Sequence, residues 1–476
     1  MGVAIVWFRN DLRLDDNPAL QAALDTGLPV LPVYVHDPDG EGSARTGAAS
    51  SAWRARSLAA LDASLRERGS RLRYFVGHAG LALGALAAAC GAEAVFWNRR
   101  YEPSVEARDA QVKRDLREQG IQAESRNGAL LFEPWELKTG KGGPFRVFTP
   151  FWRAARARWS PQACWSAPER LPEPGDVPEG VDPDHLRLCP RRGWDNGFWT
   201  HWTPGEAGAL DALEVFVEGA LRGYPVQRDR PDRVGTSRLS PHLHFGEIAP
   251  WRVVAAIEAQ RGIAPEADID GYLRQLVWRE FASHLLHHFP ETVERNFNPR
   301  FDGFDWADID GLTFDRWRRG RTGVPIIDAG MRELWATGWM HNRVRMIVAS
   351  YLCKHMRVHW RRGAEWFNET LVDADLANNV MGWQWVAGTG ADAAPYFRIF
   401  NPVTQAQKFD PQGDYVARWL PELSALPMPL RHAPWRDAAA LHRVAPHYPS
   451  LPLVDPAAGR EAALCAYSAL RAGVKR

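Results

Sequence analysis

The chain has 476 residues, of which 45% are hydrophobic and 24% are charged, and its formal net charge at pH 7 is +1. This composition is typical of a globular protein with a large apolar core, and the length favours two or three domains. A net charge so close to zero excludes a basic field over the whole surface, so a nucleic-acid partner would have to bind at a local patch of Lys and Arg.

The N-terminal residues and the cysteines indicate the compartment. Residues 3–8 form an apolar run of strand length without the basic start or cleavage site of a signal peptide. No apolar run reaches the ~18 residues that a membrane span needs. The five cysteines contain no close pair and no C-x-x-C, which predicts neither a disulfide framework nor a zinc site. We therefore expect a cytoplasmic, monomeric protein with no metal and no membrane partner.

Residues 1–130 alternate between strand-like and helix-like patterns. A helical pattern at 51–68 places Leu58, Leu61 and Leu65 on one face. The expected strands are the apolar runs at 3–8, 29–35, 71–76 and 94–97. This alternation predicts a Rossmann-like α/β domain with a parallel sheet covered on both sides. No G-x-G-x-x-G follows the first strand, so a dinucleotide is not indicated here, although ligands of such sheets bind at the carboxyl ends of the strands.

The rest of the chain divides into two stretches that differ in composition and periodicity. Residues 131–205 are rich in Pro and Gly and weakly periodic, which predicts a long connector on the surface. Residues 206–476 are helical in pattern, with the clearest helices at 271–288, 326–339 and 342–358. The second domain should therefore be all-α.

Four sequence blocks of the helical part carry the functional signal. The first, 371–385, contains Asp373, Asp375, Asn379, Trp383 and Trp385, so that two carboxylates, an amide and two indoles fall within 13 residues. The other three are the segments 278–281, 338–346 and 393–402. Together with residues 6–13 at the end of the first strand, these blocks resemble the photolyase/cryptochrome family. The resemblance covers residues 3 to 470 and is strongest to the class I cyclobutane pyrimidine dimer (CPD) photolyases.

This resemblance implies an FAD bound in the helical domain. The run Gly235–Ser240 supplies hydroxyl and backbone donors with one Arg, which suits a diphosphate, whereas the plainer interpretation of such a run is a solvated turn. Asn379 falls where the family places the residue that faces flavin N5. Arg345 and Asp373 resemble an ion pair beside the flavin ring. The cofactor-binding residues implied are Tyr224, Thr236, Ser237, Arg238, Leu239, Ser240, Tyr272, Arg279, Asn342, Arg345, Asp373, Asp375 and Asn379.

A lesion site is implied by a second set of residues. Gln275, Trp278 and Arg279 share one helix face because they are spaced i, i+3, i+4. The catalytic set implied is Trp278, Trp385, Gln275, Asn342 and Met346, with the two indoles as walls around a flipped-out dimer. The expected function is light-driven repair of CPDs in DNA by an electron from excited reduced FAD. Gln275 is a departure, since most class I enzymes have Glu there; the six-four photolyases have Gln but place two histidines where this chain has Asn342 and Met346.

Further residues match the family's electron relay and DNA-binding surface. Trp306, Trp360 and Trp383 correspond to the relay, although three core indoles would be the simpler interpretation. Residues 314–363 contain eleven Lys or Arg against three Asp or Glu, which favours binding of phosphates. The DNA-backbone contacts implied by the resemblance are Arg228, Arg343, Arg398, Gln405 and Lys408.

The sequence leaves open the antenna chromophore and the choice between a repair enzyme and a receptor. A second antenna chromophore is compatible with the first domain, but Tyr101–Glu106 lacks the expected folate pattern, so its identity and its presence are undetermined. A cryptochrome-type blue-light receptor without repair activity is the alternative function. A soluble nucleotide-binding protein outside the family would leave the coincidence of the four blocks unexplained.

Overall fold

The structure is a computed structural model that describes residues 2–160, 164–190, 193–393 and 398–473. Its chain forms two compact units, each made of three segments. The first comprises Met1–Arg222, Ser237–Pro290 and Val372–Ala377, and the second comprises Gly223–Thr236, Glu291–Leu371 and Asn378–Arg476. The division into domains at residues 130 and 205 stays a prediction.

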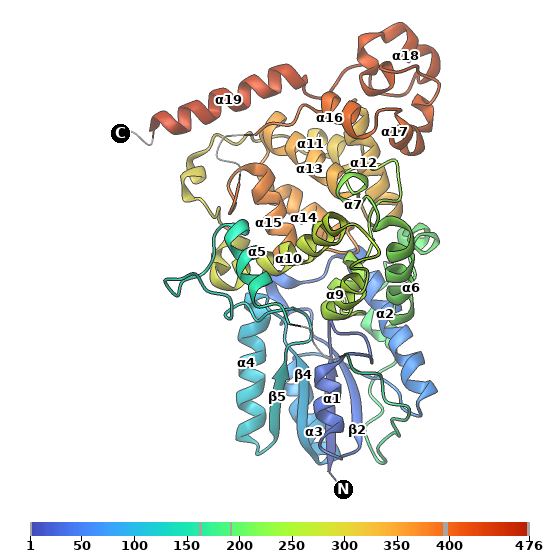
Figure 1. Cartoon of the computed structure of the whole chain (residues 1–476), viewed down its shortest axis with the longest axis vertical. Coiled ribbons are helices and arrows are strands. Elements are labelled where there is room, and N and C mark those ends of the chain that lie inside the picture. The colour runs from blue at the N-terminus through green and yellow to red at the C-terminus, as the bar shows by residue number, and fades with distance from the viewer. Residues whose placement is uncertain (1, 161–163, 191–192, 394–397, 474–476) are drawn as a thin grey trace. The chain divides into compact units, whose positions relative to one another are not determined.

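A five-stranded parallel sheet lies in the first unit (Figure 1). Its order is β3-β2-β1-β4-β5. The strands are β1 (Val3–Phe8), β2 (Val30–His36), β3 (Arg73–Val76), β4 (Ala92–Asn98) and β5 (Gln122–Arg126). The predicted α/β class and four expected strands are confirmed. The fifth, β5, escaped the sequence analysis because its residues are mostly polar and partly exposed at the edge of the sheet.

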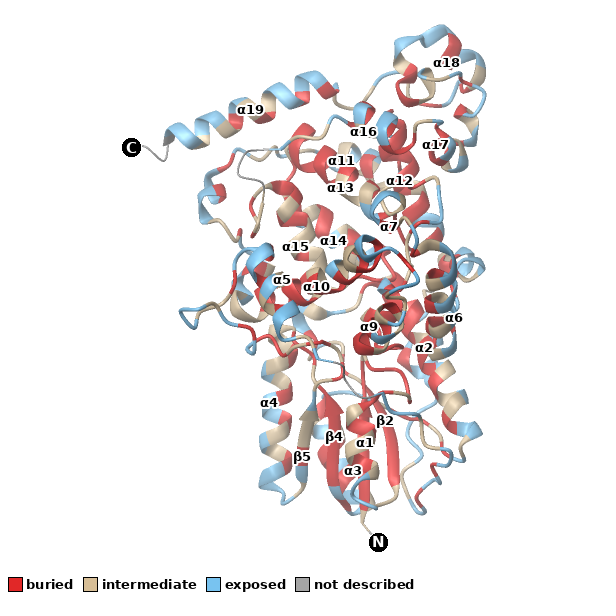
Figure 2. Cartoon of the chain, viewed as in Figure 1, coloured by how far each residue is buried: buried red, intermediate tan, exposed pale blue. Residues whose placement is uncertain are grey.

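Burial on both faces explains the continuous apolar runs. Strands β1, β2 and β4 are buried along almost their whole length (Figure 2), as expected where helices cover a parallel sheet. One face joins Ile5, Trp7, Val33 and Trp97 into a core with residues of α3 (Ala79–Cys90) and α4 (Pro103–Glu118). Helix α1 (Pro18–Leu24) packs on β1 and β4.

In the described part of the chain, the remaining helices of the first unit are α10 (Glu266–His288) and five helices that precede it in the sequence. These five are α2 (Ala48–Glu67), α5 (Phe148–Ala157), α6 (Glu206–Val215), α8 (Ser240–His244) and α9 (Pro250–Glu258). Helix α5 lies inside the predicted connector and buries Phe148, Phe151 and Ala155. A long surface connector was expected here from the sequence, and this helix was not predicted. Ten residues between Pro- and Gly-rich flanks are too short to give a clear period.

The second unit is helical, as predicted. Its helices are α7 (Tyr224–Gln227), α11 (Gly311–Arg318), α12 (Pro325–Thr337), α13 (Asn342–Ser350), α14 (Trp360–Thr370), α15 (Leu376–Ala387, from Asn378 on), α16 (Pro402–Phe409), α17 (Asp414–Trp419), α18 (Ala438–Val444) and α19 (Pro456–Gly473). The predicted helix 342–358 is shorter in the structure. After Ser350 a π-helical turn follows, and Arg357 then adopts a left-handed φ of 53°, which ends the helical path. None of the described helices has the length and hydropathy to span a bilayer.

Candidate functional site

A hydroxyl-rich turn precedes α8 in the first unit. The Tyr272 hydroxyl donates to Ser237 Oγ at 3.0 Å, and Ser240 begins α8. Between them, Arg238 adopts a φ of 56° and lies over the Trp202 ring at 4.1 Å. The turn therefore gathers hydroxyl groups and a guanidinium from a short stretch of chain, a donor set that suits a diphosphate.

Helix α8 also leads to one of the predicted carboxylates. His244, its last residue, places Nδ1 3.7 Å from the Asp375 carboxylate. Asp375 donates its backbone N–H to Asp373 O at 2.7 Å, and Asp373 is buried with 9% of its surface exposed. The first unit thus holds Ser240 and Asp375 at opposite ends of a five-residue helix. Arg345 belongs to the second unit, so its pairing with Asp373 stays a prediction.

Helix α10 presents the predicted Gln275, Trp278 and Arg279. Gln275 Nε2 donates to Gly271 O of the same helix at 3.2 Å, so the amide turns its N–H back to the helix. Arg279 donates to Ala129 O at 2.8 Å and to Leu243 O at 3.3 Å, and so ties α10 to two other segments. Trp278 is half-buried.

Within the second unit, a hydrogen bond fixes the orientation of Asn379. Its Nδ2 donates to Ala364 O at 2.9 Å. Because the amide nitrogen donates to Ala364 O, Oδ1 is the atom of Asn379 that can accept a hydrogen bond from a bound group. Arg345 donates through Nε to Met340 O at 2.7 Å. Asn342 is exposed at the start of α13, and Met346 lies one turn further along the same helix.

The three tryptophans predicted to form an electron relay differ in burial within the second unit. Trp383 and Trp360 are buried at 3% and 1% exposure, whereas Trp306 is partly exposed. The His359 ring lies 5.4 Å from Trp360 and 5.1 Å from Trp306, between centroids. A side chain at Gly363, one turn after Trp360, would meet the Trp383 ring. Helix α14 therefore approaches Trp383 one turn after Trp360, and the His359 ring lies near both Trp360 and Trp306.

The structure gathers part of the predicted DNA-binding set in the second unit. Arg343 lies over the Phe409 ring at 4.3 Å and Lys408 at 5.1 Å, while Arg343 pairs with Asp229 at 2.8 Å. Arg228 adjoins Asp229 and lies over Tyr224, whose pKa is raised to about 12 by burial. We call Arg228, Arg343 and Lys408 the basic cluster. Gln405 lies one turn before Lys408 on α16, and Arg398 is exposed. The segment 394–397 of the fourth sequence block lies outside the described residues.

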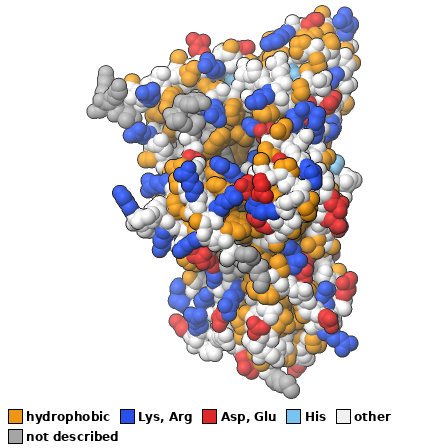
Figure 3. Space-filling model, in the orientation of Figure 1, with side chains coloured by type: hydrophobic (Ala, Val, Ile, Leu, Met, Phe, Trp, Pro, Cys, Tyr) orange, Lys and Arg blue, Asp and Glu red, His pale blue; other side chains and the backbone are white. Residues whose placement is uncertain are grey.

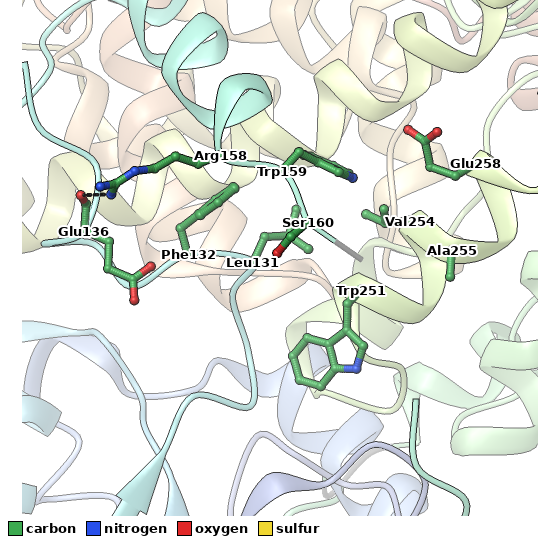
Figure 4. Close-up of a pocket in the computed structure, with 10 residues that line it drawn as sticks. All are labelled: Leu131, Phe132, Glu136, Arg158, Trp159, Ser160, Trp251, Val254, Ala255 and Glu258. Atoms are coloured by element: carbon green, nitrogen blue, oxygen red, sulfur yellow. Dashed lines mark hydrogen bonds between the residues drawn. The ribbon is translucent and has the colours of Figure 1, made fainter. Parts of the chain in front are cut away.

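A cavity of about 380 Å³ opens in the first unit beside α9. Phe132 and Trp159 stand on one side of it and Trp251 of α9 on the other (Figure 4). Arg158 borders it and donates to Glu136 O at 2.8 Å. Among the described residues, the indole N–H of the buried Trp251 meets no hydrogen-bond acceptor. The sequence analysis missed this site, since its aromatic residues are scattered singly over segments that meet only in the fold.

The carboxyl ends of the strands are filled by side chains. Arg54 and Arg100 pair with Glu41 at 3.4 and 2.6 Å. Burial by itself would raise the pKa of Glu41, but the charges of these two arginines outweigh it and hold the pKa well below its ordinary value. The cavity left there is about 10 Å³, hardly enough for one water. The predicted position for a second ligand is therefore occupied by an ion-pair network in this structure.

Comparison with known proteins decides the family. Residues 4–174 match the family described as DNA photolyase, and residues 272–469 match the one described as the FAD binding domain of DNA photolyase. The deoxyribodipyrimidine photo-lyase of Agrobacterium fabrum is 48% identical over 473 residues, 98% of each chain. The chain belongs to the photolyase/cryptochrome family. The predicted photolyase-type enzyme and its FAD-binding domain are thereby confirmed.

Three further relatives delimit this assignment. The structure of a bacterial class III photolyase from Agrobacterium tumefaciens superimposes with a TM-score of 0.95 at 48% identity, covering 99% of this chain and 98% of that one. The class I assignment is therefore not confirmed. Cryptochrome-1 of Arabidopsis thaliana is 39% identical over 91% of this chain and 65% of its own. An archaeal photolyase from Sulfolobus tokodaii, solved with two FAD molecules, has a TM-score of 0.82 at 30% identity, covering 98% of this chain and 100% of that one.

Proposed function

We propose that the chain repairs CPDs in DNA under blue or near-ultraviolet light. The observation that carries this proposal is the set Trp278, Asn342, Met346 and Trp385, with Gln275 as the one departure, in a chain 48% identical to a deoxyribodipyrimidine photo-lyase. By the same identity, class III is favoured over class I. The DNA substrate and the dimer specificity are part of this proposal.

The side chains described above fit an FAD. The Ser237–Ser240 turn would hold the diphosphate through hydroxyl and backbone donors, and Asp375 would face the flavin edge or the ribose. Asn379 Oδ1 would accept from a protonated flavin N5, because Nδ2 is held by Ala364 O. When bound, FAD supplies light absorption and the transferable electron. The chain contributes a neutral amide there, which does not oppose the charge of the reduced anionic cofactor.

Trp278 and Trp385 are the proposed walls for the extruded dimer. Stacking on an aromatic ring is worth ~1–3 kcal/mol per base. Photolyases are among the enzymes known to extrude their target, and a damaged, poorly stacked base pair costs less to open than an intact one. These residues thus bind and orient the lesion, while Asn342 and Met346 are proposed to line the same site.

Gln275 sets the chemistry at the edge of the lesion. Its Nε2 donates to Gly271 O, so Oε1 is the atom presented to the N–H of a thymine. A neutral amide accepts this hydrogen bond but brings no negative charge. We expect Gln275→Glu to raise dimer affinity or repair yield, and a fall in both would mean that the site is organised differently.

We propose that the cavity beside α9 holds the antenna chromophore. Its volume of about 380 Å³ suits a planar heterocycle between Trp159 and Trp251, and Arg158 at its border suits an anionic tail. Trp159→Ala and Trp251→Ala should then each remove any absorption band that does not belong to flavin, with FAD retained. Trp152→Ala, in α5 but not in the cavity lining, is the matched control. A second band that survives both cavity substitutions would refute this placement.

A blue-light receptor is the second candidate, because the chain is 39% identical to a cryptochrome over 91% of its length. One experiment separates the two functions. The purified flavoprotein is reduced and illuminated with an oligonucleotide that carries a thymine dimer. Loss of dimers only in light and only with reduced flavin supports repair. A protein that photoreduces but leaves the dimers intact supports the receptor.

A further inference from the structure

Phe148, the first residue of α5, lies flat against Trp278 of α10. The two ring centroids are 3.5 Å apart, and the planes differ by 6°. Phe148 is fully buried and Trp278 is half-buried. Isolated aromatic pairs prefer offset or edge-to-face arrangements over direct overlap. The surrounding packing must therefore impose this face-to-face geometry.

Two neighbours on α10 enclose the Phe148 ring. Phe281 stands nearly edge-on to both partners, 5.8 Å from Phe148 and 5.9 Å from Trp278. The Arg274 guanidinium lies over Phe148 at 5.1 Å, and Arg274 precedes Trp278 by one helical turn. Phe148 is thus held between residues 274, 278 and 281 of the same helix. The fully buried Phe148 ring therefore stands in the way of a rotation of Trp278 toward α5.

We propose that Phe148 is a positioning residue that acts through Trp278 on the lesion. It covers one face of the indole, so only the opposite face is open to an extruded base. It also fixes the plane of that open face before DNA arrives. This inference rests on the proposed function, in which Trp278 is a wall of the dimer site. The segment predicted as a connector would then contribute directly to lesion recognition.

The expected effect is on affinity rather than on the light-driven step. If the Trp278 ring is already fixed before DNA binds, less side-chain entropy is lost on binding and the complex is more stable. Aromatic pairs contribute ~0.5–1.5 kcal/mol beyond their buried area, which corresponds to about a two- to tenfold change in an equilibrium constant. Loss of the Phe148 ring should therefore weaken dimer binding by about that factor.

The test uses the full-length, FAD-loaded protein and an oligonucleotide with one thymine dimer. Dissociation constants are measured in the dark for damaged and undamaged DNA, and KM and kcat are measured in light. Phe148→Leu should raise Kd and KM for the dimer about two- to tenfold and leave kcat within about twofold. Phe148→Tyr, which keeps the ring, should restore the affinity.

Phe151→Leu is the matched control. Phe151 is buried in α5 and packs 5.1 Å from Phe281, but among the described side chains it makes no ring contact with Trp278. This substitution should lower the unfolding temperature without weakening dimer binding. In a Trp278→Leu background, Phe148→Leu should add no further loss, because its effect passes through the indole. Equal losses in Phe148→Leu and Phe151→Leu, or additive losses with Trp278→Leu, would overturn the proposal.

The dark measurements keep the two proposals apart. If the wild type binds the dimer preferentially but repairs nothing in light, the repair function fails while the Phe148 comparison still decides the positioning role. If the wild type binds damaged and undamaged DNA equally, there is no lesion wall to position and both proposals fail.

Discussion

Asn379 is held by a single described hydrogen bond, and that bond determines what the side chain offers to a cofactor. An aspartate could not donate to Ala364 O, so Asn379→Asp would place two acceptors against each other, 2.9 Å apart in the present geometry. A carboxylate would also oppose the anionic reduced flavin. We predict a more negative midpoint potential of the bound flavin, measured by spectroelectrochemical titration at pH 7. An unchanged potential would contradict the position proposed for Asn379.

Gly363 leaves room for the ring of Trp383, the innermost residue of the predicted relay. A Cβ there would overlap the six-membered ring of Trp383, which is buried and cannot turn into solvent. Gly363→Ala should destabilise the fold by about 1–3 kcal/mol and slow flavin photoreduction, since Trp383 must shift. Gly382→Ala is the matched control, because a Cβ at Gly382 meets open space. Thermal unfolding and the photoreduction rate measure the two effects; equal rates in both variants would remove Trp383 from the relay.

The candidate site residues could be selected from the sequence, but the orientations of their side chains could not be predicted from it. The motif around Asp373 to Trp385 identified the amide and the indoles, because their order and spacing carry the family resemblance. Nothing in that motif indicates that Asn379 donates to Ala364, fifteen residues earlier. Such pairings depend on how α14 meets α15, which is a tertiary property.

At the scale of elements, apolar runs in the sequence predicted the strands that are packed on both faces. Strands β1, β2 and β4 were correct because burial on both faces leaves a continuous apolar run. Edge strand β5 and helix α5 were not predicted, for different reasons. Strand β5 is polar, and α5 is short and flanked by Pro and Gly. Helix α13 was predicted too long, since a period of 3.6 residues does not distinguish an α-helix from one that passes into a π-turn.

His359 caps the start of α14 and lies near two tryptophans of the predicted relay. Its Nδ1 accepts the Arg361 backbone N–H at 3.3 Å as the N-cap of α14. Burial, followed by the nearby Arg361 charge, lowers its pKa, so the ring stays neutral at pH 7 and places no positive charge between Trp360 and Trp306. Lowering the pH below the ordinary histidine value of 6.5 eventually protonates the ring. A cation there would disfavour an oxidised indole on either side.

We therefore predict that photoreduction slows as the pH falls below that ordinary histidine value. His359→Asn should abolish this component, because asparagine caps a helix well and does not titrate. Transient absorption of the flavoprotein over a pH series measures it. A pH profile that is the same in the wild type and in His359→Asn would exclude His359 as the titrating group.

At the scale of the whole molecule, part of the basic excess in residues 314–363 is compensated by acidic partners. Of the eleven basic residues in 314–363, Arg318, Arg332, Arg343 and Arg357 form ion pairs with Asp315, Glu422, Asp229 and Asp305. Lys354 is buried against Ala387 O, and burial lowers its pKa to about 7. Basic and acidic side chains are intermixed over the face in Figure 3. Affinity for DNA should therefore depend on a few local charges rather than on net charge.

Asp229 offers a test of this dependence, because its carboxylate pairs with Arg343 of the basic cluster and would compete with a DNA phosphate for it. We predict that Asp229→Asn strengthens binding to duplex DNA at moderate salt. If one more phosphate is neutralised, the slope of log K against log salt should steepen by about 0.9. Lys408→Gln should change affinity and slope in the opposite direction.

Glu422→Gln is the matched control, since it also removes one negative charge and releases Arg332, outside the predicted DNA contacts. Fluorescence anisotropy with a labelled duplex over a salt series measures all three variants. Two models make different predictions here: a local cluster requires Asp229→Asn to exceed Glu422→Gln in both affinity and slope, whereas a response to net charge makes them equal. Equal effects of the two substitutions would contradict the proposal that Arg228, Arg343 and Lys408 are the preferred phosphate contacts. A long-range, salt-screened effect of net charge would then explain the change in DNA affinity.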